Sequence, residues 1–71
     1  ENEHLPEAVK KLLEVMEYDI PYTIRELMEK LELKSREGFR RNYLHPAVKL
    51  NLVRLTVPDK PNSRNQRYVK I

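Results

Sequence analysis

Residues 52–71 read LVRLTVPDKPNSRNQRYVKI, two short apolar alternations separated by a long polar stretch. In the first, Val53, Leu55 and Val57 alternate with polar residues, which is the period of a half-buried strand. The second, residues 66–71, alternates as well, and the two runs predict a β-hairpin. Its loop would hold about eight residues, more than the usual two to five. The two expected faces of the second strand are Arg67, Val69 and Ile71 on one side and Gln66, Tyr68 and Lys70 on the other.

The expected hairpin loop is polar and basic, and two interpretations of it stay open. Three cations, Lys60, Arg64 and Arg67, could neutralise phosphates. Asn62, Ser63 and Asn65 could add hydrogen bonds. Alternatively, the prolines stiffen the loop and the short polar side chains close local turns, so that the string encodes loop shape. The two interpretations are compatible with each other.

Helical spacing of apolar residues predicts two amphipathic helices in the first half, over residues 5–18 and 23–31. Pro6 suits the first position of the first helix. Thr23 followed by Glu26 forms the capping box that opens the second. The residues between the two helices are expected to contain a short extended piece at Tyr22.

A third helix is expected to begin at Ser35, which suits an N-cap. Pro46 falls inside its periodic pattern, so this helix is predicted to end or kink near Leu44. A last turn would start at Pro46. Asn51 stands where a helix C-terminus favours a left-handed residue.

The order of elements is helix, short strand, helix, turn, helix, strand, long loop, strand. This order predicts an α+β fold of the winged helix-turn-helix type, with three to four helices and a C-terminal hairpin as the wing. The 71 residues are expected to form a single domain, residues 1–71. Because the first residue is Glu1 and not Met, we interpret the chain as a fragment of a longer protein.

The composition narrows the class of protein. The chain contains no cysteine, which excludes disulfides and thiolate metal sites and favours a cytoplasmic setting. No apolar run approaches the roughly 20 residues of a membrane span, so no membrane partner is expected. Residues 1–33 hold nine acidic and four basic residues, whereas residues 34–71 hold two and ten. This asymmetry favours a polyanion partner for the second half; the alternative is that the two halves attract each other.

The second half resembles the winged-helix domain at the C-terminus of many Fic-family proteins, and also the tails of prokaryotic proteins related to RecG-like ATP-dependent DNA helicases. The PDKPNSRNQ string is the most specific part of the resemblance. The positions that carry it are Phe39, Arg40, Tyr43, Leu44, Pro46, Ala47, Leu52, Val53, Thr56, Pro58, Asp59, Lys60, Pro61, Ser63, Gln66 and Tyr68. The resemblance implies a DNA-binding fold in a prokaryotic regulator.

No catalytic constellation is found in the sequence. Fic catalysis needs a His-Pro-Phe motif followed by a glycine-rich anion-binding stretch, whereas Ala47 follows His45 and Pro46 here and the chain has one glycine. We therefore expect no enzyme activity and no cofactor in this chain, and any chemistry of a parent protein would lie outside it. His4 and His45 are distant in sequence and are not expected to hold a metal.

The candidate DNA-binding residues lie around the third helix and the wing. Arg41 also stands four residues after Glu37, so a helix ion pair is the alternative for it. Tyr43 and Tyr68 are expected to be core aromatics. Gly38 either allows close approach of a ligand or is incidental. The candidates are Lys34, Ser35, Arg36, Arg40, Arg41, Lys60, Asn62, Ser63, Arg64 and Arg67.

The expected function is binding of double-stranded DNA, dominated by phosphate contacts. It requires that folding bring the cations of the third helix and of the wing onto one solvent-facing side. The alternative is a protein-interaction module that docks on other domains of a parent protein or forms a homodimer.

Overall fold

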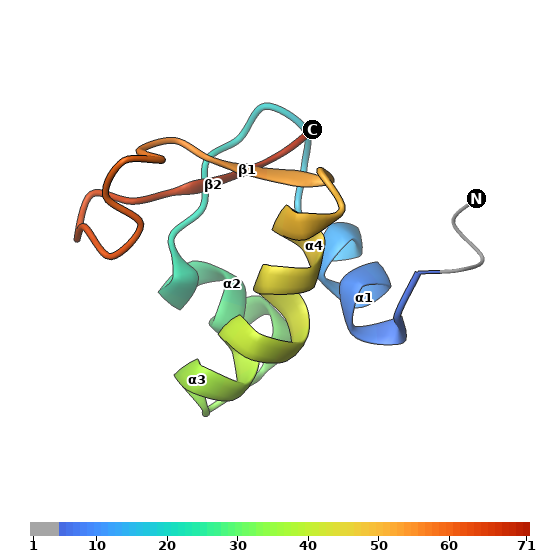
Figure 1. The fold of residues 1–71 in the computed structure, drawn as a ribbon. Helices are drawn as coiled ribbons and strands as arrows, with labels where there is room; N and C mark the ends of the chain where they lie inside the picture. Colours follow the sequence, from blue (N-terminus) through green and yellow to red (C-terminus); the bar gives the residue numbers. More distant parts are fainter. Residues whose placement is uncertain (1–4) are drawn as a thin grey trace.

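The computed structural model describes residues 5–71. Helices pack below a two-stranded hairpin, whose long loop projects to one side (Figure 1). This arrangement matches the predicted order of elements. The elements are α1 (Glu7–Val15), α2 (Ile24–Leu31), α3 (Arg36–Phe39), the π-helical turn η2 (Arg40–Leu44), α4 (His45–Lys49), β1 (Val53–Leu55) and β2 (Tyr68–Lys70).

Short-range signals set the ends of several helices as the sequence predicts. The Thr23 hydroxyl accepts a hydrogen bond from the Glu26 N–H at 3.1 Å, and the Glu26 carboxylate accepts one from the Thr23 N–H at 2.8 Å. The Ser35 hydroxyl accepts from the Gly38 N–H at 3.1 Å. Asn51 follows α4 with a left-handed φ of 62°. The first helix differs, because α1 ends at Val15 and Pro6 is its N-cap.

The third helix does not end near Leu44, and the disturbance expected there takes the form of a π-helical turn. The chain stays helical from Arg36 to Lys49 because η2 changes the hydrogen-bond register before Pro46 (Figure 1). The His45 N–H bonds to the Arg40 carbonyl, five residues back. Pro46 follows this turn at the start of α4, so the change of register falls next to the residue that has no N–H to donate.

The π-helical turn also keeps one face of this long helix in the core. Phe39, Leu44 and Ala47 are all buried. In a regular α-helix, residues five apart differ by about 140° around the axis. Wider winding at η2 brings Phe39 and Leu44 onto the same side, which explains how a helix that continues past a proline can bury both.

The hairpin strands pair antiparallel, with Leu55 opposite Tyr68 and Val53 opposite Lys70. Both strands are shorter than predicted, but Thr56 and Arg67 remain bonded at the root of the wing, N–H to carbonyl at 3.0 Å. The expected extended piece between the first two helices is present: Tyr22 and Tyr68 exchange backbone hydrogen bonds at 2.9 and 2.8 Å.

A glutamine closes the wing. Gln66 is the buried polar residue of the described chain, 6% exposed. Its carbonyl oxygen accepts from the Val57 N–H at 3.0 Å, and its amide nitrogen donates to the carbonyls of Val57 at 2.5 Å and Lys60 at 3.0 Å. Beyond the ends of β1 and β2, the Gln66 side chain thus satisfies backbone groups that longer strands would otherwise pair.

One core joins every element. Buried side chains from α1, α2, the long helix and both strands pack together, and Tyr68 is among them, as predicted. Tyr43 is half-buried and stacks on Phe39 with ring centroids 5.7 Å apart. The fully buried large side chains are Phe39, Leu12, Leu27, Leu44, Val9 and Val53.

Candidate nucleic-acid interface

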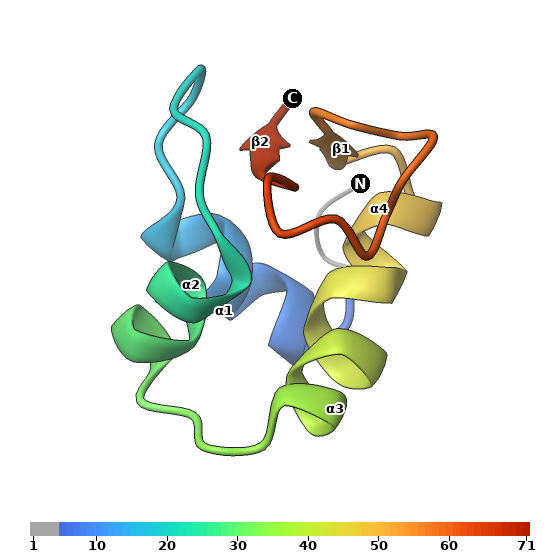
Figure 2. The ribbon, with the colours of Figure 1, turned by 90° about the vertical axis from the view of Figure 1, so that its left-hand side faces the viewer.

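The start of α2, the beginning of the long helix and the wing enclose a groove of about 330 Å³. Figure 2 looks onto this side, with α2 on one side, α3 and α4 on the other, and the wing above them. Hereafter this is called the arginine groove. It is lined by Thr23, Ile24, Arg25, Arg36, Arg40, Pro61, Asn62, Ser63, Arg64, Gln66 and Tyr68.

Four arginines reach the arginine groove from three parts of the fold. Arg25 comes from the first turn of α2, fixed by the capping box, and Arg36 from the first turn of α3, which the Ser35 cap fixes. Arg40 belongs to η2, in the same long helix, and Arg64 to the wing. None of the residues lining this groove is acidic. The local positive charge is therefore not neutralised from within, which is the arrangement of an anion site.

Two ion pairs are found among residues 5–71, and only one of them involves a groove arginine. Arg25 lies 3.7 Å from the Glu29 carboxylate on the exposed side of α2. Exposed pairs of this kind contribute little and are readily broken. Within the described chain, Arg36, Arg40 and Arg64 make no ion pair.

Arg40 links the long helix to the wing. Its guanidinium nitrogen Nη2 donates to Oδ1 of Asn62 at 3.2 Å. A second guanidinium edge remains for an incoming anion, because the fork carries five N–H donors. The contact holds the wing near the helix without blocking the cationic groups.

Tyr68 combines burial with two neighbouring arginines of the groove. Burial raises the pKa of the Tyr68 phenol, while the nearby Arg40 and Arg36 lower it. Tyr68 lines the groove, and its hydroxyl makes none of the side-chain hydrogen bonds found among the described residues. It is thus a donor beside the same space as the guanidinium groups.

A second hollow adjoins the groove on the outer face of the long helix. Arg36 and Arg40 line both hollows, and the second adds Glu37, Arg41 and His45. The Arg41 guanidinium bonds to the Glu37 carboxylate at 3.0 Å, so the predicted helix ion pair is confirmed. Arg41 thus extends the cationic surface but carries its own counter-ion.

The structure brings together part of the predicted set. Arg36, Arg40, Asn62, Ser63 and Arg64 line the arginine groove.

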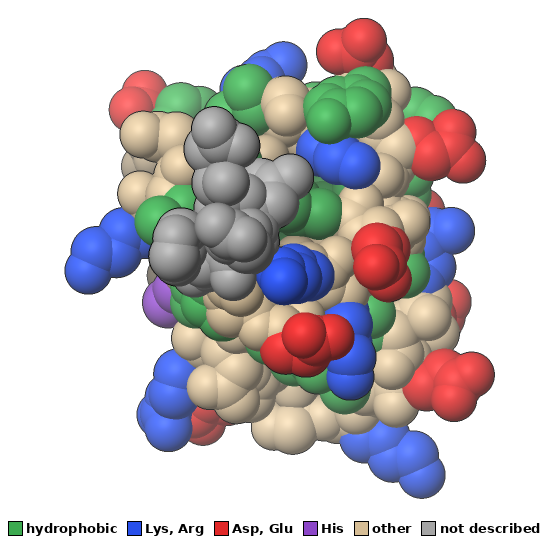
Figure 3. All heavy atoms as spheres, turned by 90° about the vertical axis from the view of Figure 1, so that its right-hand side faces the viewer, with side chains coloured by type: hydrophobic (Ala, Val, Ile, Leu, Met, Phe, Trp, Pro, Cys, Tyr) green, Lys and Arg blue, Asp and Glu red, His purple; other side chains and the backbone are tan. Residues whose placement is uncertain are grey.

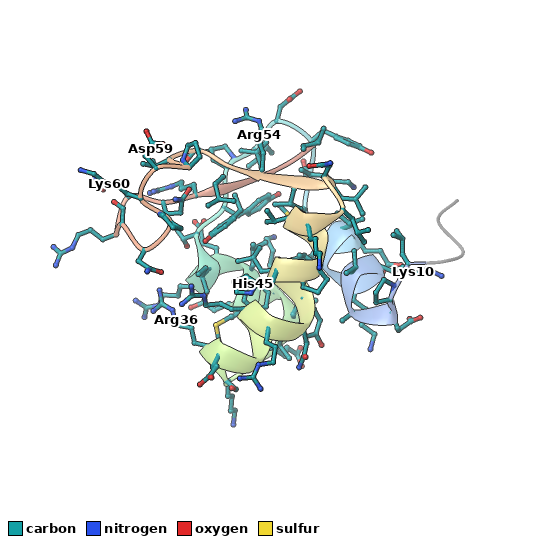
Figure 4. All side chains as sticks on the ribbon, in the orientation of Figure 1. Lys10, Arg36, His45, Arg54, Asp59 and Lys60 are labelled. Atoms are coloured by element: carbon teal, nitrogen blue, oxygen red, sulfur yellow. The ribbon has the colours of Figure 1, made fainter. Side chains whose placement is uncertain are left out.

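The remaining candidates lie outside the groove. Lys34 is exposed before α3, and the Ser35 hydroxyl is engaged as its cap. Lys60 projects outward from the wing, away from Arg36 (Figure 4). Arg67 is exposed and donates to the Asn65 carbonyl at 3.3 Å. The expected common side is therefore formed by three of the predicted cations and one cation that was not predicted.

Among the groove residues absent from the predicted set, Arg25 adds a cation and Tyr68 a phenol; the others are Thr23, Ile24, Pro61 and Gln66. Arg25 belongs to the acidic first half, whereas a polyanion partner was expected for the second half. The capping box at Thr23 was the available signal, because it fixes which residues occupy the first turn of α2.

A local packing reason explains glycine at position 38: a side-chain Cβ there would lie 3.1 Å from the Ser35 Oγ and crowd the cap.

The face turned away from the groove has a different character. Acidic and basic side chains are intermingled over it (Figure 3). No cluster of three or more metal-ligating His, Asp or Glu side chains is found between residues 5 and 71; His4 lies outside the described residues. In the same range, every helix is too short and polar to cross a bilayer.

Comparison with known proteins identifies the relatives. Residues 7–69 match the family described as Filamentation induced by cAMP protein Fic-like, C-terminal domain. No curated protein matches the chain. A crystal structure of a Fic family protein from Desulfovibrio desulfuricans G20 superposes on 99% of the chain with a TM-score of 0.87 and 31% sequence identity.

The chain spans 21% of the length of that Fic family protein. The comparison confirms the predicted winged-helix architecture and the Fic part of the sequence resemblance; it does not support the relation to RecG-like helicases. Because the family match covers nearly all of the described residues, the chain belongs to the Fic-like C-terminal domain family.

Proposed function

We propose that this domain binds double-stranded DNA, with the arginine groove and the outer face of α3 against the phosphate backbone. The observation that carries the proposal is the convergence of Arg25, Arg36, Arg40 and Arg64 on one groove whose lining has no carboxylate. Guanidinium groups bind phosphate oxygens bidentately, so this lining suits a phosphate backbone. In this proposal the domain acts in the cytoplasm as a binding module without catalytic activity of its own.

The wing and helix serve different purposes in the proposed complex. The wing presents Asn62, Ser63 and Arg64 to a phosphate, which positions the domain but carries no sequence information. Any base reading would fall to the exposed face of the long helix, where Glu37 partly offsets Arg41. We therefore expect binding with weak sequence preference.

The test is duplex binding as a function of salt. With about five phosphate contacts, the logarithm of the binding constant should fall against the logarithm of salt concentration with a slope of about −4. Replacing Arg36 and Arg64 together by alanine should weaken binding and reduce the magnitude of the slope by about 2. Arg54→Ala is the matched control, because Arg54 is exposed on the opposite face of the hairpin (Figure 4). A salt-independent affinity, or equal losses in the control, would refute the proposal.

A second function is favoured by a different observation. Tyr18, Ile20 and Ile71 are 63%, 41% and 59% exposed, and the Tyr18 backbone is bridged to Lys70, next to Ile71. These apolar groups lie near the end of β2, away from the arginine groove, and suit docking on another domain of a Fic protein or on a second copy. Sedimentation of wild type and Ile71→Asp at several concentrations tests self-association, and an unchanged monomer mass in both would reject the homodimer.

A further inference from the structure

The arginine groove has more cationic groups than one backbone phosphate needs. An internucleotide phosphodiester carries one negative charge, whereas a terminal phosphate carries about 1.5 to 2 at neutral pH and exposes three acceptor oxygens. Four arginines line this groove; Arg25 pairs with Glu29 at 3.7 Å, the other three make no ion pair among residues 5–71, and no carboxylate belongs to the lining. The excess charge matches a phosphate monoester better than a phosphodiester.

The polar groups on the groove lining also suit a terminal phosphate. Arg36, Arg40 and Arg64 approach from the helix and the wing, and Tyr68 and Ser63 line the same space. The Ser63 hydroxyl already accepts from the Asn65 N–H at 3.1 Å, which leaves its own proton to donate. The groove therefore has donors from the long helix, the wing and β2, more than one phosphodiester of a DNA backbone would engage.

The size of the groove sets the ligand class. A volume of about 330 Å³ is at the lower end of small-molecule sites. Ile24 and Pro61 provide apolar surface beside the cationic groups. That combination accommodates one phosphate and a sugar or base against the apolar edge.

We propose that the arginine groove is a site for a phosphate monoester, supplied by a free 5′-mononucleotide or by the 5′-phosphorylated end of a DNA strand. This inference rests on the proposed function in that the same arginines serve both. It adds a preference for the terminal dianion over the internal diester and makes Arg36 and Arg64 the residues that set this preference.

The experiment titrates the 71-residue chain with three probes that share a base and sugar. Thymidine 5′-monophosphate carries the monoester, the dinucleotide TpT carries only the diester, and thymidine carries neither. Calorimetry and arginine side-chain NMR shifts report binding. We expect the monophosphate to bind at least about fivefold more tightly than TpT, because of its extra charge, and thymidine not to bind.

Variants locate the binding site. Arg36→Ala and Arg64→Ala should each weaken monophosphate binding about tenfold, as expected for loss of a charged hydrogen bond. Arg36→Lys should recover only part, because an ammonium keeps the charge but loses the fork. Arg54→Ala should bind as wild type does. Equal affinity for the monophosphate and TpT, absence of binding, or an equal loss in Arg54→Ala would overturn the inference.

A pair of duplexes separates this inference from the proposed function and distinguishes the two sources of the monoester. Duplexes of the same sequence with 5′-phosphate or 5′-hydroxyl ends are compared at fixed salt. Tighter binding of the phosphorylated duplex supports the strand end as a source, whereas monophosphate binding with no preference between duplexes assigns the site to free nucleotides. Salt-dependent duplex binding with no monophosphate binding would overturn the monoester site and leave the duplex proposal standing. Monophosphate binding without duplex binding would do the reverse.

Discussion

Replacing Gln66 by alanine tests whether one side chain holds the wing in place. The amide of Gln66 makes three hydrogen bonds, to the Val57 N–H, the Val57 carbonyl and the Lys60 carbonyl. At about 1 kcal/mol for each bond, their loss amounts to about 3 kcal/mol. The wing backbone can partly regain water, so we expect the free energy of unfolding to fall by about 2 kcal/mol. For a domain of this size, that lowers Tm by about 8–16 °C.

The assay is urea denaturation followed by circular dichroism, with two companion variants. Asn65→Ala is the matched control, because Asn65 is the exposed neighbour and its side chain makes none of the observed hydrogen bonds. Gln66→Glu keeps the acceptor but points a carboxylate oxygen at the two carbonyls. It should be at least as destabilising as alanine at pH 7.

The pH dependence of the Gln66→Glu variant gives the reasoning its sharpest check. Burial and the two carbonyls should raise the folded pKa of the introduced carboxyl above its unfolded value. Stability should therefore recover as the pH falls and the carboxyl, once protonated, again donates. Amide exchange at Val57 shows whether the wing opens before the core. The reasoning is refuted if Gln66→Ala unfolds within about 0.5 kcal/mol of wild type, below the usual net value of even one hydrogen bond.

Three further changes have defined outcomes. Thr23→Ala removes the hydroxyl half of the capping box of α2 and should lower the free energy of unfolding by about 1 kcal/mol in urea denaturation. Asn51→Ala places a Cβ-bearing residue without a local polar group at φ 62° and should cost about 1 kcal/mol, whereas Asn51→Gly should stay within about 0.5 kcal/mol of wild type. Arg40→Ala should raise the pKa of Tyr68 further, since Arg40 lowers it; phenolate absorbance, with a Tyr68→Phe subtraction, measures this. Because burial raises the folded pKa of Tyr68, its contribution to stability should be complete below its unfolded pKa of about 10 and be lost as the pH rises through the folded value.

The parts of the fold that sequence predicted are those set by neighbours in the chain. The capping box at Thr23, the cap at Ser35 and the left-handed Asn51 each depend on residues within about one helical turn. The alternation of apolar residues at Val53 and Leu55 predicts β1 for the same reason, since it depends only on neighbouring residues. Such signals determine where elements begin and which face turns inward, and so they also determine the order of elements that defines a winged helix.

The long helix shows where local rules stopped being sufficient. Proline rules correctly identify Pro46 as a disturbance, but they do not say how the chain absorbs it. Here the disturbance is absorbed upstream in η2, because burying Phe39, Leu44 and Ala47 together stabilises a helix that continues past the proline. That outcome depends on packing against α1 and the strands, which no short window of sequence contains.

The candidate site was predicted only in part, again because its composition depends on residues that folding brings together. Arg25 is the example. Dividing the chain into an acidic and a basic half counts charges by their position in the sequence. A ligand interacts instead with the charges that lie close to it in the folded structure. In α2 the Glu29 carboxylate lies 3.7 Å from Arg25 on the exposed side of the helix, and the first turn still places Arg25 in the same groove lining as Arg36 and Arg64. An acidic segment therefore contributes a cation to the arginine groove, and folding concentrates charge there more than the sequence halves predict.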